Sequence, residues 1–154
     1  MNLVDELHAI AGALTAAGID YAICGGIAVT IHGATRTTKD IDVLVERKDI
    51  PRVLEVVRPL GYVFAALPMT FDAGTERERH VQRVTKVEGK EHLVLDLLIA
   101  EAAFEGLLSS RVAIDLPEGA LSVVPLDVLV KMKRLAGRAQ DQADIEKLEN
   151  PDEP

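Results

Sequence analysis

The sequence predicts an α+β fold in which a small mixed β-sheet is flanked by helices. Leu3, Leu7, Ile10 and Leu14 recur at helical spacing, whereas Asp40–Val45 has the alternation of a buried strand. Segments of these two kinds are interleaved along the chain. At 154 residues the chain can build one proper core. We therefore expect a single domain over 1–148, followed by a frayed acidic tail at 149–154.

The first helix is expected over 2–17, and Gly18 ends it. Tyr21–Cys24 is a short apolar run that stops at Gly25-Gly26, which is typical of a buried strand leading into a tight turn. A short helix over 27–32 follows the glycine pair, before the strand 40–45.

The middle of the chain continues with a helix over 49–59, because Pro51 is tolerated in a first helical turn. A strand is expected at 61–66, and the turn-forming residues of 68–76 predict a loop. A hairpin follows, with strands at 81–87 and 92–99. Beyond it we expect a short helix at 102–108, short strands at 112–116 and 120–124, and helices at 125–135 and 139–148.

Composition excludes several classes of protein. The single cysteine, Cys24, rules out an internal disulfide and a cysteine-rich zinc site. No stretch approaches 18 uncharged apolar residues, and the amino terminus is not a secretory signal, so we expect no membrane association and a cytoplasmic location. A net charge of −8 argues against a general duplex-DNA partner. A basic run, residues 131–138, is interpreted either as a solvated helix face or as a local anion site.

Three aspartates carry the strongest chemical signal. Asp40 and Asp42 stand two apart on one strand, so their carboxylates share a face and repel each other unless a cation compensates. Asp96 lies in another apolar strand and would add a third carboxylate if that strand is a neighbour. Three converging acids can hold two Mg²⁺ ions for in-line displacement at phosphorus. Taken singly, the same residues fit an exposed polar face, an edge residue or a cap.

Gly25-Gly26 supplies a second element. A strand that ends in two glycines and opens into a helix exposes backbone N–H groups that attract anions. A phosphate cradle would then lie beside the acids, although a glycine pair by itself is more often a simple turn.

In this order and spacing, Gly25-Gly26, Asp40-Ile-Asp42 and Asp96 resemble the nucleotidyltransferase superfamily with the polymerase-beta-like minimal fold. His32-Gly33 and the closing stretch 133–144 resemble the branch of AbiEii-type toxin nucleotidyltransferases. The resemblance covers roughly residues 5–148.

The resemblance implies an Mg²⁺-dependent nucleotidyltransferase that moves a nucleoside monophosphate from a nucleoside triphosphate to a hydroxyl of RNA (tRNA) or protein. It also implies the toxin of a toxin–antitoxin or phage-defence pair, with a cognate antitoxin as partner. Asp40, Asp42 and Asp96 would be catalytic and would bind two Mg²⁺ ions. The implied nucleotide-binding residues are Gly25, Gly26, Thr38, Lys133 and Arg138.

Two other functions stay open. Gly26 stands where many active relatives have serine, and the chain is short, which favours a non-catalytic nucleotide-binding or partner-binding module of the same fold. Alternatively, the acids only stabilise loops.

Several further residues have a structural interpretation beside a functional one. Arg36, Thr37 and Thr38 either contact phosphate or support entry into the strand. Cross-strand ion pairing is favoured over an RNA contact for the basic residues around Arg83. For Asp141 and Asp144, pairing with Lys133, Arg138 or Lys147 is favoured over a role at the nucleotide site. His32 is expected to bind a backbone group, and Cys24 to be a small buried hydrophobe.

Overall fold

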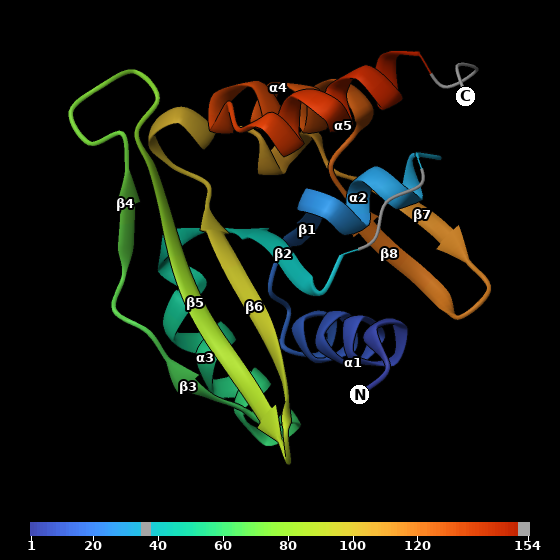
Figure 1. The fold of residues 1–154 in the computed structure, drawn as a ribbon. Helices are drawn as coiled ribbons and strands as arrows, with labels where there is room; N and C mark the ends of the chain where they lie inside the picture. Colours follow the sequence, from blue (N-terminus) through green and yellow to red (C-terminus); the bar gives the residue numbers. More distant parts are fainter. Residues whose placement is uncertain (35–37, 151–154) are drawn as a thin grey trace.

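The structure, a computed structural model, describes residues 1–34 and 38–150 (Figure 1). The helices are α1 (Leu3–Ala16), α2 (Gly25–Ile31), α3 (Ile50–Val57), α4 (Leu126–Ala136) and α5 (Ala139–Glu149). The strands are β1 (Tyr21–Cys24), β2 (Asp40–Val45), β3 (Tyr62–Ala65), β4 (Met69–Phe71), β5 (Arg79–Glu88), β6 (Glu91–Ile99), β7 (Val112–Leu116) and β8 (Gly119–Val123). Short 3-10 turns occupy 47–49, 58–60, 102–104 and 108–110.

All the strands join one mixed sheet in the order β3-β5-β6-β2-β1-β8-β7, and β4 pairs with β5 off this path. β2 runs parallel to β6 and β1 parallel to β8, whereas the other neighbours are antiparallel. The predicted α+β class with a mixed sheet flanked by helices is confirmed.

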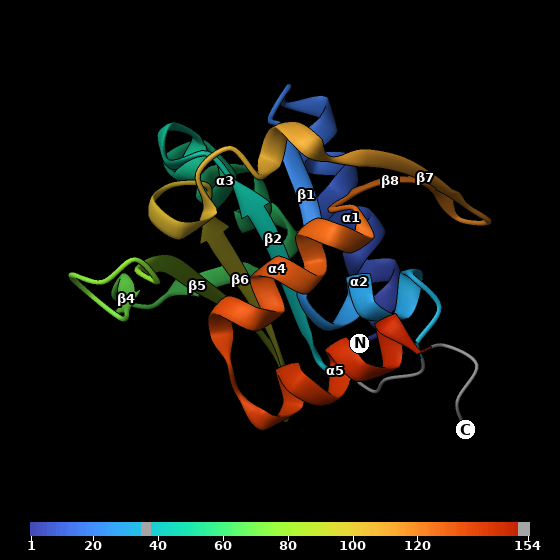
Figure 2. The same ribbon diagram turned by 90° about the horizontal axis from the view of Figure 1, so that it is seen from above.

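Helices cover both faces of the sheet (Figures 1 and 2). α1 and α3 pack on one face, and α2, α4 and α5 lie on the other. Strand β6 shows why both faces are covered: Leu95 and Leu97 are fully buried, while Asp96 and Leu98 alternate with them and are half-buried. The second face therefore carries polar side chains beneath α4.

Most predicted elements are present within one or two residues, and three expectations need correction. The loop predicted at 68–76 contains β4, because β5 begins at Arg79 and its first half can pair with Met69–Phe71. The helix predicted at 102–108 is two separate 3-10 turns, with Gly106 at φ +78° between them. Helix α2 begins at Gly25 instead of residue 27, so the glycine pair forms its first turn.

Only the first two residues of the predicted acidic tail, 149–154, are among the described residues. Glu149 ends α5 and Asn150 caps it, whereas 151–154 fall outside the described residues. No helix in the described part of the chain is long and apolar enough to cross a membrane.

Candidate active site

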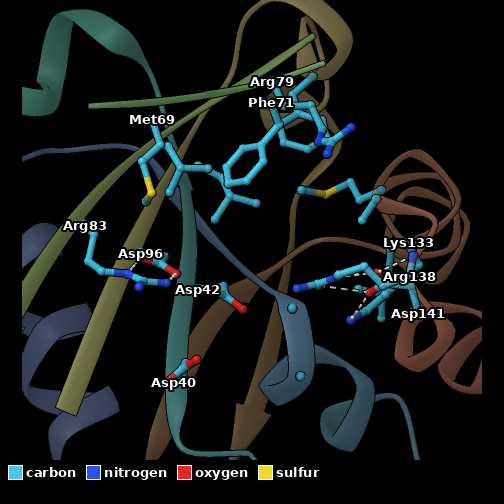
Figure 3. Close-up of a pocket in the computed structure, with 18 of the residues that line it drawn as sticks. Asp40, Asp42, Met69, Phe71, Arg79, Arg83, Asp96, Lys133, Arg138 and Asp141 are labelled. Carbon is cyan, nitrogen blue, oxygen red and sulfur yellow. Dashed lines mark hydrogen bonds and ion pairs between the residues drawn. The ribbon is translucent and has the colours of Figure 1, made fainter. Parts of the chain in front are cut away.

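The structure brings the three predicted acids to one face of the sheet. In the parallel pair β2–β6, Asp42 lies directly opposite Asp96. Asp40 precedes Asp42 by two residues on β2, so its side chain leaves the sheet on the same side. Figure 3 shows the three carboxylates grouped at one side of a pocket.

The pocket has a volume of about 430 Å³ and lies between this face of the sheet and α4. All eight residues predicted for the site line it. They are Gly25, Gly26, Thr38, Asp40, Asp42, Asp96, Lys133 and Arg138. The neighbouring Arg36 and Thr37, for which a phosphate contact was one interpretation, lie outside the described residues.

Gly25 packs directly against Asp42. A Cβ built on Gly25 would lie 1.9 Å from Oδ2 of Asp42, and the backbone there has φ +65°. Both the missing side chain and the left-handed conformation are therefore required for the carboxylate to occupy this position. The first glycine of the pair positions Asp42, in addition to the backbone role that the sequence suggested.

We expect Gly25→Ala to lower the free energy of unfolding by about 2 kcal/mol or more, because alanine is strained at this φ and collides with Asp42. The matched control is Gly12→Ala within α1, where an added Cβ meets nothing within 4 Å. Helix propensity predicts that this control is neutral or stabilising. Urea unfolding of both variants measures the difference, and equal stabilities would contradict the assignment.

Asp42 is in an unfavourable place for a negative charge. Burial raises the pKa of its carboxyl, and the charges of Asp96 and Asp40 raise it further, to about 7. Lys133 and Arg138 oppose this shift without cancelling it. A cation bound between the carboxylates would relieve the cost of ionising Asp42.

Asp96 already has a cation beside it. Arg83 donates from Nε to Oδ1 of Asp96 at 2.8 Å and from Nη2 to Oδ2 at 3.0 Å, and the two residues are cross-strand neighbours. The cross-strand pairing predicted for this basic stretch is confirmed here. The bidentate bond raises the pKa of Arg83. Asp96 is mostly buried, whereas the Arg83 side chain is 42% exposed and has solvent into which it can move.

The donors are of the kind that a hard divalent cation prefers, although the three carboxylates do not form a closed ligand cluster. Carboxylate oxygens are the ligands that Mg²⁺ prefers, and the ionised form of Asp42 needs a compensating charge. Among residues 1–34 and 38–150, however, no group of three or more His, Cys, Asp or Glu side chains is close enough to hold a metal ion. Asp96 is turned to Arg83 instead, so the two-ion site stays a prediction.

We expect Arg83→Gln to lower the free energy of unfolding by about 1 kcal/mol in the absence of metal. We also expect the melting temperature of this variant to rise more on addition of Mg²⁺ than that of the unmodified protein. The reason is that three carboxylates would lose their cation, so the metal would stabilise the native state more strongly. Arg111→Gln is the control, because Arg111 pairs with Asp20 away from the pocket. A Mg²⁺ effect no larger than that of the unmodified protein would contradict a metal site shared by Asp96.

Lys133 belongs to a buried ionic network between α4 and α5. Its Nζ lies 3.3 Å from Asp141 and 3.0 Å from Asp144, and all three side chains are buried. Asp144 also accepts from Gln140 at 2.8 Å, and Asp141 accepts from Nε of Arg138 at 2.7 Å. The predicted pairing of the two aspartates is confirmed.

The network gives different surroundings to Lys133 and Arg138, the two cations predicted to bind nucleotide. Burial opposes ionisation of Asp141, but the bond from Arg138 and the charge of Lys133 outweigh it and hold its pKa below the usual value. Lys133 is enclosed with two carboxylates, whereas the Arg138 side chain is 73% exposed at the rim of the pocket. Arg138 is therefore the better placed of the two for contact with an entering anion.

The structure also shows the surroundings of His32, Cys24 and Thr38. Nε2 of His32 donates to the carbonyl of Val124 at 2.8 Å, which confirms its backbone role. Cys24 is buried, and burial raises the pKa of its thiol, in agreement with an unreactive core residue. The Thr38 hydroxyl lies 3.4 Å from the backbone N and O of Asp40, so it supports the start of β2 while also lining the pocket.

The apolar half of the pocket was not predicted from the sequence. This half is lined by Met69, Phe71, Val81, Leu98 and Phe104. The alternation of Met69 and Phe71 was the available signal, but it lies in the segment interpreted as a loop.

Comparisons with known proteins agree with this geometry. Residues 6–81, just under half of the chain, match the family model described as aminoglycoside-2″-adenylyltransferase. The match includes Gly25, Gly26, Asp40 and Asp42 and ends before Asp96. A search of curated proteins found no match.

Similarity to solved structures identifies the fold. TM1012 from Thermotoga maritima, assigned as a nucleotidyltransferase, superimposes with a TM-score of 0.65 at 12% identity, over 96% of this chain and 92% of that one. The chain has the nucleotidyltransferase fold. ANT(2″)-Ia in complex with adenylyl-2″-tobramycin gives a TM-score of 0.58 at 14% identity, covering 96% of this chain and 87% of that one. JHP933 from Helicobacter pylori gives 0.54 at 20% identity, with coverages of 94% and 63%.

The predicted fold is thereby confirmed, and the family match supports the predicted enzyme class, a nucleotidyltransferase.

Proposed function

We propose that this protein is an Mg²⁺-dependent nucleotidyltransferase that transfers a nucleoside monophosphate from a nucleoside triphosphate to an acceptor hydroxyl. One observation carries the proposal: Asp40, Asp42 and Asp96 lie on the same face of the sheet and line one pocket, which Gly25-Gly26 and Arg138 also line. Paired carboxylates beside groups suited to phosphate are what this chemistry needs.

Each residue has a distinct role in the proposal. Asp40 and Asp42 would hold Mg²⁺, which supplies positive charge to the triphosphate when bound. Backbone N–H groups of Gly25 and Gly26, with the guanidinium of Arg138, would orient the β- and γ-phosphates. Asp96 would share a metal and accept the proton of the attacking hydroxyl once Arg83 has released it.

The proposal includes several finer predictions about the acceptor, the metal and the partner. The resemblance predicts an RNA (tRNA) or protein acceptor, two bound Mg²⁺ ions and a toxin role with a cognate antitoxin. The composition predicts a cytoplasmic location. The relatives named above add an aminoglycoside as an acceptor to be tested, because ANT(2″)-Ia was solved with an adenylylated tobramycin.

The test is a transfer assay with each α-³²P-labelled nucleoside triphosphate, Mg²⁺, and either total tRNA, cell-extract protein or tobramycin. We expect the label to move to an acceptor with the unmodified chain and with Asp115→Asn, a control at an exposed carboxylate on β7. Asp42→Asn should transfer nothing.

Calorimetry of nucleoside triphosphate binding separates the alternatives. Binding without transfer to any acceptor would favour the non-catalytic module. Neither binding nor transfer by a folded protein would overturn the proposal.

A further inference from the structure

The pocket has an apolar half that the reaction chemistry alone does not require. Leu98 follows Asp96 by two residues on β6, so it lies on the same face about 7 Å further along the strand. Val81 is the cross-strand neighbour of Leu98, and Met69 is that of Val81. Three apolar side chains thus form a row beside the carboxylates, and Phe71 extends it (Figure 3).

The other carboxylates of the pocket already have protein cations beside them. Asp72 accepts from Arg79 at 2.8 Å, and that guanidinium also stacks over Phe71, 5.6 Å from the ring centroid. Asp96 is paired with Arg83, and Asp141 is enclosed in the network of α4 and α5. Among the described residues that line the pocket, this leaves the metal-binding pair, Asp40 and Asp42, for an incoming cation. Besides the release of Arg83 that the proposed function already requires, a polycationic acceptor would therefore need to displace the cations that neutralise Asp72 and Asp141.

The direction of attack decides what the apolar half faces. In the proposed function the leaving pyrophosphate lies toward Gly25-Gly26 and Arg138, and displacement at phosphorus is in line. The acceptor hydroxyl must therefore approach from the opposite side of the carboxylates, where Asp96 and Leu98 lie. The group that carries this hydroxyl then rests against the row of Leu98, Val81 and Met69.

We propose that the acceptor is an uncharged hydroxyl compound with an aromatic or branched aliphatic body, which packs against Met69, Phe71, Val81, Leu98 and Phe104. The proposal rests on the proposed function and names its acceptor class. In the reaction the acceptor oxygen forms a bond to the α-phosphorus, and the bond from that phosphorus to the bridging oxygen breaks. The electron pair leaves with pyrophosphate, and the hydroxyl proton passes to Asp96 and then to solvent. No electron donor or acceptor is needed.

The methionines provide a direct test. The chain has three, of which Met69 and Met132 line the pocket and Met1 does not. With methyl-¹³C-methionine protein, titration with benzyl alcohol should shift the Met69 and Met132 signals and leave Met1 in place. Tobramycin, a polycation, should leave Met69 unshifted. N-acetyltyrosinamide tests whether the hydroxyl comes from a tyrosine side chain of a protein instead of a small molecule. Binding of either aromatic alcohol supports the proposal. The alcohol that binds more tightly indicates which of these two acceptors the pocket fits.

A pair of phenylalanine variants provides the control. Phe71→Ser should weaken benzyl alcohol binding about fivefold, the size of a lost aromatic contact. Phe64→Ser should leave it unchanged, because Phe64 is 59% exposed and lies outside the pocket. Equal binding by the two variants would overturn the proposal.

The proposal would also be overturned if neither aromatic alcohol shifted the Met69 signal, or if tobramycin shifted it more than the alcohols do. A shift of the Met69 signal by Mg²⁺-ATP alone that equals the shift by the alcohols would overturn it as well, because the nucleobase would then occupy the apolar half of the pocket. Calorimetry with Mg²⁺-ATP tests the proposed function separately. The two failures can therefore be told apart, because the alcohol titration needs no nucleotide.

Discussion

Asp42→Asn is expected to abolish nucleotidyl transfer and, above pH 7, to make the protein more stable. Activity should fall at least ~100-fold, because the variant loses a negatively charged metal ligand at the reacting phosphate. Stability should rise because asparagine removes a charge that is costly in this place. The two effects have opposite signs, which is typical of a residue kept for chemistry and not for folding.

The pH dependence of this difference in stability follows from the raised pKa of the Asp42 carboxyl. In the unfolded chain the Asp42 carboxyl ionises near its ordinary pKa of 3.8, whereas in the folded protein it ionises near 7. Below pH 4 the carboxyl is protonated in both states, so the wild type has its full stability and asparagine confers no advantage. Between pH 4 and 7 the wild type progressively loses this stability as the unfolded state ionises first. Above pH 7 the loss is complete, at about 2 kcal/mol for a half-buried carboxyl.

Urea unfolding at pH 4, 6 and 8 without divalent metal measures this prediction. The difference in unfolding free energy between Asp42→Asn and wild type should grow across the series. Asp115→Asn, at an exposed carboxylate on β7, should show no such trend. Mg²⁺ should narrow the difference at pH 8 by stabilising the wild type alone. A variant less stable than wild type at pH 8 would contradict the assigned environment of Asp42.

The strands that carry the acids could be predicted because their own sequences specify them. Alternation in Asp40–Val45 and in residues 92–99 fixes which side chains share a face, and the parallel pairing of β2 with β6 then brings Asp42 opposite Asp96. Strand β4 has no such independent signal. Its three residues form a strand because β5 offers them an edge, and this is a property of the folded sheet.

The electrostatics of the site could be predicted only in part. The residue types that pair were foreseen, but their burial was not: Lys133 appeared as a surface cation next to Arg134 in a basic run. In the structure Lys133 is 5% exposed, while the Arg134 side chain is 62% exposed. The reason is the position of α5, which covers Lys133 and brings Asp141 and Asp144 to it. The attachment of Asp96 to Arg83 likewise depends on strand register that residue spacing does not specify.

Lys133→Met should destabilise the fold by about 3 kcal/mol. Methionine fills a similar volume but leaves Asp141 and Asp144 buried without the shared ammonium. Breaking a buried ion pair from one side is costly, because the remaining charge stays unsolvated. Arg138 keeps its contact with Asp141, so the expected cost lies at the lower end of the range for such pairs.

Arg134→Met is the matched control, since Arg134 is the next residue of α4 and its partner Glu149 is exposed. An exposed pair of this kind contributes less than about 1 kcal/mol. Urea unfolding at pH 7 compares the two variants. A second change, Asp144→Asn in Lys133→Met, should recover part of the lost stability, because it removes one of the two buried negative charges. If Lys133 instead contacts the triphosphate, Lys133→Met will keep its stability and weaken Mg²⁺-ATP binding. The ratio of these two effects therefore decides whether the buried lysine holds α5 in place or binds the nucleotide.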